Sequence, residues 1–396
     1  MRTPYDSRWS IHTADSILHG HAGDLSAYMP VLKKNNFYFI DYENGKPYNG
    51  YPIGVSLLAT PFVAVIELFK PSFTSLLTEE VPDNVEKVLA SIFGAVAGVL
   101  FFWLILNQFK RWVVALAATF IFSLCTSMWS LATRALWQHG PLVMMLVIAM
   151  LLLQRARYNQ SLVQYVSLPL ASAYIIRPIA AVPIVIISAF VLLYHRTFFL
   201  RYLGWAALLA IPWCFYNFEI YGRILSPYYL LLFQQEGASP SPGMALAGLL
   251  ISPGRGLFVY SPVLLFAFAG FVVAVRDREQ RALHVAYAGT IVSMLAVIML
   301  FPVWWAGHSF GPRFMTDLLP FFAYFTAFAL DLGPSSARKA MLAAMAILAV
   351  ISFDIHMRGA TRYGPWYWNV YPEDVDRNPS RAWDWSDPPF LRTCPC

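Results

Sequence analysis

Long apolar segments recur along most of this chain, and they constrain its fold more than any other feature of the sequence. Beyond about residue 86, ten segments are long enough for the hydrocarbon core of a bilayer or slightly short of it. They are residues 87–107, 112–131, 138–153, 161–176, 178–195, 202–218, 256–275, 283–301, 314–331 and 339–353. Only 13% of the 396 residues are charged, which is too few to cover a chain of this size with polar groups in water. The sequence therefore predicts an all-α polytopic integral membrane protein with about ten transmembrane helices.

The polar residues gather at the two ends of the chain, which predicts three parts. These are a large first extracytoplasmic loop with juxtamembrane helices at residues 1–86, a transmembrane helical domain at 87–355 and an extracytoplasmic aromatic tail at 356–396. Within the first part, the apolar stretch 51–69 contains Pro52, Pro61 and Glu67. We therefore interpret it as a juxtamembrane helix at the bilayer surface rather than a spanning helix.

The basic residues set the orientation of the predicted spans. The short connections on one side carry most of them, namely Lys110, Arg111, Arg155, Arg157, Arg196, Arg201, Arg276, Arg278, Arg281, Arg338 and Lys339. Because short cytoplasmic loops are enriched in lysine and arginine, this side is predicted to be cytoplasmic. The loops 218–255 and 304–313 then lie outside with residues 1–86 and the tail. The formal net charge of +6 is thus an orientation signal and not a sign of a nucleic-acid partner. We expect a multi-pass protein of the plasma membrane, in bacteria the inner membrane, whose active face is extracytoplasmic.

An exported N-terminal segment without a preceding span is uncommon. We therefore expect that a further apolar span precedes residue 1 in the natural protein, and the upstream genomic sequence tests this expectation.

The first candidate for chemistry is Asp6, in the opening segment YDSRWSIHTADSILHG. A carboxylate near the membrane surface, beside Arg8, can act as a general base towards a hydroxyl or an amine. The alternatives are a solvated loop acid or an N-cap for a helix that begins near residues 7–10. Asp15 lies inside an apparent helix that Gly20 ends, and a solvated helix face is a sufficient explanation for it.

The second candidate is the motif WWAGHSFGPRF at residues 304–314, in which glycines and a proline impose a turn. His308 and Arg313 are predicted to lie at the outer membrane surface, where the planar fork of an arginine suits phosphate oxygens. Asp317 follows at or near membrane depth, where an ionisable group is costly unless it is paired or wet. A pair between Arg313 and Asp317, four residues apart on one helix, is the structural alternative.

Three further polar residues lie at the edges of apolar stretches. Arg177 breaks an apolar run before Pro178, and either a functional role or snorkelling to lipid headgroups explains it. Arg255 lies between two glycines that let the backbone approach a ligand, so a phosphate contact and a plain turn are equally consistent with it. His139 stands at a span boundary, where a histidine is more often a hydrogen-bonded packing residue than a base.

The predicted topology brings six of these candidates to one side of the membrane and to one depth: Asp6, His139, Arg177, Arg255, His308 and Arg313. An acid and several arginines at a membrane surface suit a lipid phosphate or pyrophosphate and a group to be transferred. The sequence contains neither the phosphate-binding pattern GxxxxGKS/T nor a GxGxxG that opens a helix after a strand. A donor on this side is therefore expected to be lipid-linked.

The order of these parts resembles the polytopic membrane glycosyltransferases of the GT-C class, which includes the protein O-mannosyltransferases and the lipid A aminoarabinose transferases. The segment YDSRW, with Asp6, is similar to the acidic start of the first outer loop in that class, and NGYPIGVSLLATPF is similar to its proline-containing juxtamembrane motif. The phrases WWAGHSFGPRFMTDLLPF and RAWDWSDPPFLR resemble those of uncharacterised bacterial members. The chain departs from the class in two respects: the first span is missing, and Asp6 is followed by Ser7 where two adjacent acids are frequent.

The resemblance implies transfer of a sugar from a polyprenyl-phosphate donor to an acceptor that is a lipid, a glycan or a protein. Asp6 would accept the proton of the attacking group, and Arg177, Arg255 and Arg313 would stabilise the leaving phosphate. The wider set expected to contact the substrate is Arg8, Asp15, His139, Arg177, Arg255, His308, Arg313 and Asp317.

The sequence requires no cofactor and no metal. Some related enzymes use a divalent cation, but no carboxylates cluster along the sequence in a way that demands one. Two alternatives make no bond: a transporter or flippase of lipid-linked glycans, and a scaffold protein whose aromatic tail binds a partner.

Overall fold

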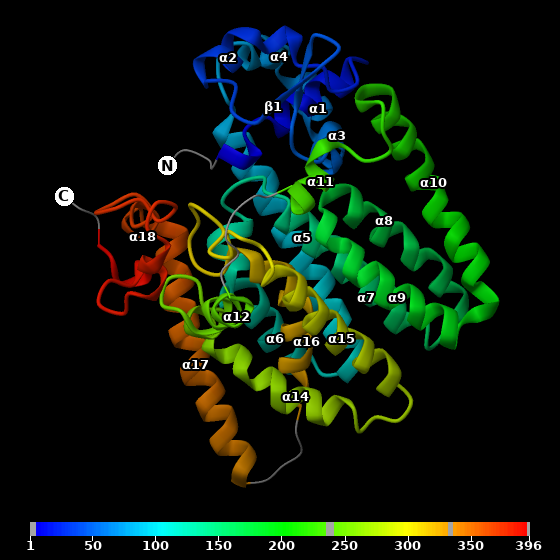
Figure 1. The fold of residues 1–396 in the computed structure, drawn as a ribbon. Helices are drawn as coiled ribbons and strands as arrows, with labels where there is room; N and C mark the ends of the chain where they lie inside the picture. Colours follow the sequence, from blue (N-terminus) through cyan, green and yellow to red (C-terminus); the bar gives the residue numbers. More distant parts are fainter. Residues whose placement is uncertain (1–4, 235–240, 332–335, 394–396) are drawn as a thin grey trace.

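The computed structural model describes residues 5–234, 241–331 and 336–393. Parts of the predicted loop 218–255 and of the predicted tail 356–396 lie outside these ranges. The described chain is almost entirely helical, which confirms the all-α part of the prediction (Figure 1).

The N-terminal unit lies at one end of the molecule (Figure 1). It contains α1 (Ser10–Leu18), α2 (Met29–Lys34), an antiparallel hairpin of β1 (Ile40–Glu43) and β2 (Lys46–Asn49), α3 (Gly54–Phe69) and α4 (Phe73–Leu77). Asn44 and Gly45 form the hairpin turn, and both have positive φ, which is the backbone conformation that a tight two-residue turn needs.

Helix α1 is buried although its sequence is polar. It packs against α3 on one side and contacts β2 as well, so the residues from Ser10 to Ser16 are all buried. The prediction that Asp15 lies on a solvated helix face is wrong, because its side chain has no exposed surface. The covering elements come from later in the chain, and they supply hydrogen-bond partners to His12, Asp15 and Ser16.

The body of the molecule is a bundle of apolar helices. Its longer members are α5 (Asp83–Phe109), α6 (Trp112–Leu124), α7 (His139–Arg155), α8 (Ser167–Ile176), α9 (Ala181–Tyr194), α10 (Arg196–Tyr221), α12 (Pro242–Ile251), α14 (Phe266–Ala274), α15 (Arg281–Ile298), α16 (Leu319–Leu330) and α17 (Ser336–Thr361). Shorter pieces are α11 (Pro227–Gln234), α13 (Leu257–Tyr260) and α18 (Gly364–Tyr367).

Four helices of the described chain are long and apolar enough to cross a membrane, namely α5, α10, α15 and the part of α17 from Lys339 to Thr361. Most of the other predicted spans are shorter apolar helices or begin in a different helical form. The predicted span 161–176 begins as the 3₁₀ segment Gln160–Val166, and the predicted span 314–331 begins as the 3₁₀ segment Arg313–Leu318. Length and composition therefore support four of the roughly ten predicted transmembrane helices.

Helix α10 shows why the body is suited to lipid. Only 11% of its most apolar window is buried, and Leu208, Ile211 and Phe215 are exposed. A soluble protein rarely leaves such a continuous apolar surface in water. Lipid solvates it without cost, so the exposed face of α10 agrees with a membrane location.

The basic connections gather at the end of the bundle opposite the N-terminal unit (Figure 1). Arg111 pairs with Asp331 at 2.5 Å, and Arg157 lies 3.6 Å from Glu279. The Lys110 ammonium lies 5.4 Å from the centre of the Tyr158 ring. These contacts join connections that the sequence assigned to one side.

Candidate functional site

Asp6 lies at the junction of the N-terminal unit and the helical bundle. It belongs to the 3₁₀ turn Tyr5–Ser7, just before α1. Its carboxylate forms a close ion pair with the guanidinium of Arg313, which is 307 residues away in the sequence. The hydroxyl of Tyr38 donates to the other carboxylate oxygen at 3.2 Å. The predicted N-cap role of Asp6 is wrong, because Trp9 occupies the N-cap of α1 and no side chain caps it.

The environment of Asp6 keeps it ionised. Burial raises its pKa, but the charge and hydrogen bond of Arg313 and the hydrogen bonds of Tyr51 and Tyr38 outweigh burial and hold the pKa below its ordinary value. A carboxylate with a low pKa is present as the base at neutral pH but has a weak affinity for protons. Asp6 therefore becomes a stronger base when Arg313 moves away from it or is shared with another anion.

Arg313 links Asp6 to a second carboxylate through a histidine. Its guanidinium lies over the Trp137 ring, 4.2 Å from the ring centre, and its Nε donates to His139 Nε2 at 3.3 Å. An arginine only donates, so His139 Nε2 is an acceptor and the ring proton is on Nδ1. That nitrogen donates to Asp317 Oδ1 at 2.7 Å. The order Asp6–Arg313–His139–Asp317 is thus one connected polar chain.

Asp317 is buried and is balanced by a second arginine. Its Oδ2 lies 2.9 Å from Arg177 Nε. The two groups form an ion pair, but their geometry is not that of a hydrogen bond. Arg177 also donates to Gln138 Oε1 at 3.2 Å. The alternative reading of Asp317 as the helical partner of Arg313 is therefore wrong. A buried carboxylate without these partners would be strongly unfavourable.

A small cavity lies inside this polar cluster. It is lined by Asp6, Ser10, Tyr51, Pro52, Val55, Leu136, Trp137, Gln138, Arg177, Tyr228 and Arg313. Its volume is about 20 Å³, which is room for a single water. Two buried N–H donors on its lining, Trp137 Nε1 and Gln138 Nε2, have no hydrogen-bond partner in the part of the chain that the structure describes. Unsatisfied donors that line one cavity with two arginines suit an anion.

Five predicted site residues meet in this cluster, namely Asp6, His139, Arg177, Arg313 and Asp317. Arg8 is buried beside α1 and donates to Asn35 Oδ1 at 2.5 Å. His308 is half-exposed, and its Nε2 lies 3.0 Å from Asp374 Oδ1 in the tail.

Arg255 is fully buried and holds the 304–313 loop in place. Its guanidinium donates to the backbone oxygens of Trp305 and Gly307 at 2.6 and 2.9 Å, and to Asn369 Oδ1 at 2.7 Å. These bonds fix the loop that carries Arg313. The predicted contact of Arg255 with a phosphate stays a prediction.

Three tyrosines of the site were not predicted from the sequence. Tyr38 and Tyr51 bond Asp6, and Tyr228 lines the cavity and donates to Gln138 Oε1 at 3.4 Å. Tyr51 and Tyr228 are in ring contact, with centres 5.5 Å apart. A tyrosine in a polar outer segment is the only signal the sequence offers for them, and the chain contains 21 tyrosines.

Comparisons with protein-family models, with curated proteins and with solved structures give no match to this chain. The case for a function therefore rests on the polar cluster and on its position at the end of an apolar bundle.

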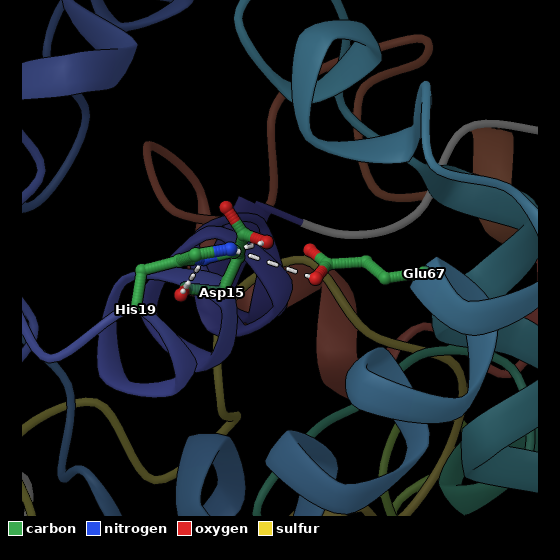
Figure 2. Close-up of side chains that lie close together, drawn as sticks. All are labelled: Asp15, His19 and Glu67. Carbon is green, nitrogen blue, oxygen red and sulfur yellow. Dashed lines mark hydrogen bonds and ion pairs between the residues drawn. The ribbon is translucent and has the colours of Figure 1, made fainter.

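Asp15 belongs to a separate cluster with His19 and Glu67 (Figure 2). Burial raises the pKa of Asp15 to about 6, and a hydrogen bond shared with Glu67 adds to this effect. The sequence showed no clustered carboxylates because these two are 52 positions apart, and the packing of α1 on α3 brings them together. A more exposed group of His308, Asp374 and Asp376 also has metal-ligating side chains.

Proposed function

We propose that this chain is a membrane glycosyltransferase of the GT-C type, which moves a sugar from a polyprenyl-phosphate donor to an acceptor on the extracytoplasmic face of the membrane. The observation that carries the proposal is the cavity that an ionised carboxylate, Asp6, shares with the two arginines Arg177 and Arg313. Such a transfer needs a general base for the acceptor and cationic groups for the leaving phosphate in the same site. The protein would lie in the plasma membrane, the inner membrane in bacteria.

The proposed reaction can be written with each bond, proton and charge accounted for. The acceptor oxygen or nitrogen attacks the anomeric carbon and forms the new bond, and its proton passes to Asp6. The bond from the anomeric carbon to the phosphate oxygen breaks, and the phosphate leaves with the electron pair. No acid is needed for this leaving group, because its negative charge is stabilised by cationic donors.

The pairing of Asp6 with Arg313 connects the two halves of the reaction. In the structure, Arg313 pairs with Asp6 and Arg177 pairs with Asp317. His139 Nε2 accepts a hydrogen bond from Arg313. When Asp6 takes up the acceptor's proton it loses its charge. Arg313 is then left with a positive charge to offer to the developing phosphate charge. Proton transfer and departure of the phosphate therefore assist one another.

The cavity must open to admit the donor. A volume of about 20 Å³ is far below the several hundred Å³ of ordinary small-molecule sites. Asp6 and Tyr51 come from the N-terminal unit, whereas Arg177 and Arg313 come from the bundle. Movement of the N-terminal unit away from the bundle would separate Asp6 from Arg313 and enlarge the site.

A groove in the bundle supports a lipid-linked donor. It has a volume of about 360 Å³, is lined mainly by apolar side chains of α8, α9 and α10, and reaches Ile175 at the end of α8. Arg177 follows two residues later. Tyr229, which donates to the backbone oxygen of Tyr174 at 2.8 Å, is the neighbour of the cavity residue Tyr228. A polyprenyl tail in this groove would bring its phosphate to Arg177.

The test is transfer of radiolabel from a polyprenyl-phosphate sugar pool in membranes that contain the wild-type chain or Asp6→Asn. Loss of a general base is expected to lower the rate by about 100-fold or more. Glu79→Gln is the matched control, because Glu79 is an exposed acid of the same unit. Equal rates for wild type and Asp6→Asn, at equal protein levels, would remove Asp6 as the base. Movement of labelled lipid-linked sugar across the bilayer without transfer would favour the transporter.

A further inference from the structure

Asp15, His19 and Glu67 converge where α1 packs against α3 (Figure 2). Asp15 and His19 are four residues apart at the end of α1, so they lie on one face of the helix. Glu67 is in the last turn of α3. One ligand atom from each residue lies within 4.8 Å of the others. Two carboxylates and one imidazole make a three-residue donor set of the kind that binds Zn²⁺ with a water as fourth ligand.

The histidine is oriented for metal binding. Its Nδ1 lies 3.0 Å from the backbone oxygen of Asp15, which places the ring proton on Nδ1 and leaves the lone pair on Nε2. That nitrogen lies 3.6 Å from Glu67 Oε2. Ligands about 2.1 Å from a tetrahedral ion are roughly 3.4 Å apart, so this separation is close to that of two bound ligands. A backbone carbonyl that fixes the tautomer is a usual outer partner of a metal-bound histidine.

Each carboxylate is held by a hydroxyl on one of its oxygens. Tyr28 donates to Asp15 Oδ2 in a close hydrogen bond, and Thr74 donates to Glu67 Oε1 at 2.8 Å. Asp15 Oδ1 lies 3.6 Å from His19 Nδ1 and accepts a long hydrogen bond of 3.5 Å from Thr74, and Glu67 Oε2 lies 3.6 Å from His19 Nε2. The short hydroxyl bonds therefore leave Asp15 Oδ1 and Glu67 Oε2 on the side of the imidazole, as outer partners do in metal sites.

The charges at this point are not balanced by protein groups. Asp15 has no exposed side-chain surface and Glu67 has 18%. Within the described ranges, the ion pairs of both carboxylates are with His19 alone. Two adjacent carboxylates of which one is buried are unfavourable unless a shared proton or a cation compensates them. His19 is 43% exposed, which gives an ion and its water a route from the solvent.

We propose that Asp15 Oδ1, His19 Nε2 and Glu67 Oε2 bind one Zn²⁺ ion, which fastens α1 to α3. This site is independent of the proposed transfer reaction. The ion replaces the missing positive charge, and the fourth position takes a water on the side of His19. Because α1 follows Asp6 directly, the ion also fixes the helix from which the Asp6 turn extends.

The test uses the full chain in detergent, stripped with a chelator and titrated with Zn²⁺. Wild type is expected to bind one ion per chain by metal analysis, and its unfolding temperature is expected to rise when Zn²⁺ is added. His19→Ala removes a half-exposed ligand, so the chain should still fold; its zinc affinity should fall at least ten-fold and the temperature shift should disappear. Glu67→Gln should do the same.

His308→Ala is the matched control, because His308 belongs to the more exposed group with Asp374 and Asp376. It should keep the bound ion and the temperature shift. The proposal is overturned if the stripped wild type takes up no stoichiometric Zn²⁺, or if His19→Ala binds it as tightly as wild type does.

Discussion

Two acidic sites lie at α1, and they differ in what balances their charge. Asp6, before the helix, faces the guanidinium of Arg313, a cation that keeps its proton in proteins. Asp15, near the end of the helix, faces a second carboxylate and a histidine. The first site is a balanced pair, and the proposed reaction shares its cation with a phosphate. The second brings two carboxylates to one histidine, which suits a cation from outside. The same residue type beside the same helix therefore suits different chemistry.

Arg313→Gln is expected to have the largest effect on the balanced site. The leaving phosphate loses a cationic donor, so transfer should fall by about 100-fold or more. The measurement is the initial rate in membranes, normalised to protein. Arg111→Gln is the control, because it removes an exposed pair with Asp331 at the opposite end and should change the rate less than about two-fold. If both variants keep wild-type rates, Arg313 does not bind the phosphate.

Asp317→Asn tests whether the chain of buried charges holds the site together. It leaves Arg177 and His139 without their carboxylate, and breaking a buried pair costs about 3–5 kcal/mol. The thermal unfolding temperature in detergent should fall clearly. Asp354→Asn breaks a half-exposed pair with Arg358 within α17 and should cost about 0.5 kcal/mol. Equal unfolding temperatures for the two variants would contradict the account.

Tyr28→Phe tests the second site, where zinc is proposed to bind. It removes the hydroxyl that orients Asp15 and leaves the three proposed ligands in place. Loss of an outer partner lowers metal affinity by roughly 10-fold, so zinc should bind more weakly than to wild type. Calorimetric titration of the stripped chain measures this, with Tyr42→Phe on the exposed face of β1 as control. An unchanged affinity would show that Tyr28 does not orient a metal ligand.

Tyr38→Phe should give the smallest effect, visible mainly in the pH profile of kcat/KM. The pKa of Asp6 is below its ordinary value, so the base form, and the stability from its ion pair, are present above the ordinary carboxyl pKa. Both are lost as the pH falls through the lower, folded value. Wild-type kcat/KM should therefore not fall between about pH 8 and about pH 5.

Tyr38→Phe removes one hydrogen bond that lowers this pKa, so the acid loss should begin at a higher pH, with a change of less than about three-fold near neutrality. An acid limb that moves to lower pH, or a wild-type profile that loses activity around pH 6, would contradict the assignment.

The convergence of the balanced site was predictable, but its partners were not. The alternation of basic connections assigned Asp6, Arg177 and Arg313 to one side, and the structure brings them together. The alternative pair of Arg313 with Asp317, given in the sequence analysis, assumed that both residues lie on one α-helix. The segment Arg313–Leu318 is 3₁₀, in which residues four apart point in different directions. Arg313 therefore reaches Asp6, and Asp317 reaches Arg177.

The second site, Asp15 with His19 and Glu67, could not be predicted from local sequence patterns. Asp15 appeared to be a solvated acid because its helix is polar, and Glu67 appeared to be a polar residue of an interfacial helix. Only the packing of α1 on α3 joins them, and no spacing in the sequence encodes that contact. The hairpin of β1 and β2 had a local signal, since Asn-Gly is typical of a tight turn, but its apolar alternation is weak.

The most direct test of the central claim is the stoichiometry of the reaction in proteoliposomes that contain the purified chain and a polyprenyl-phosphate sugar. The account predicts one polyprenyl phosphate released for each sugar that appears on the acceptor, and neither product with Asp6→Asn. The contradictory result is sugar that crosses the bilayer while still attached to its lipid, at the same rate in wild type and Asp6→Asn.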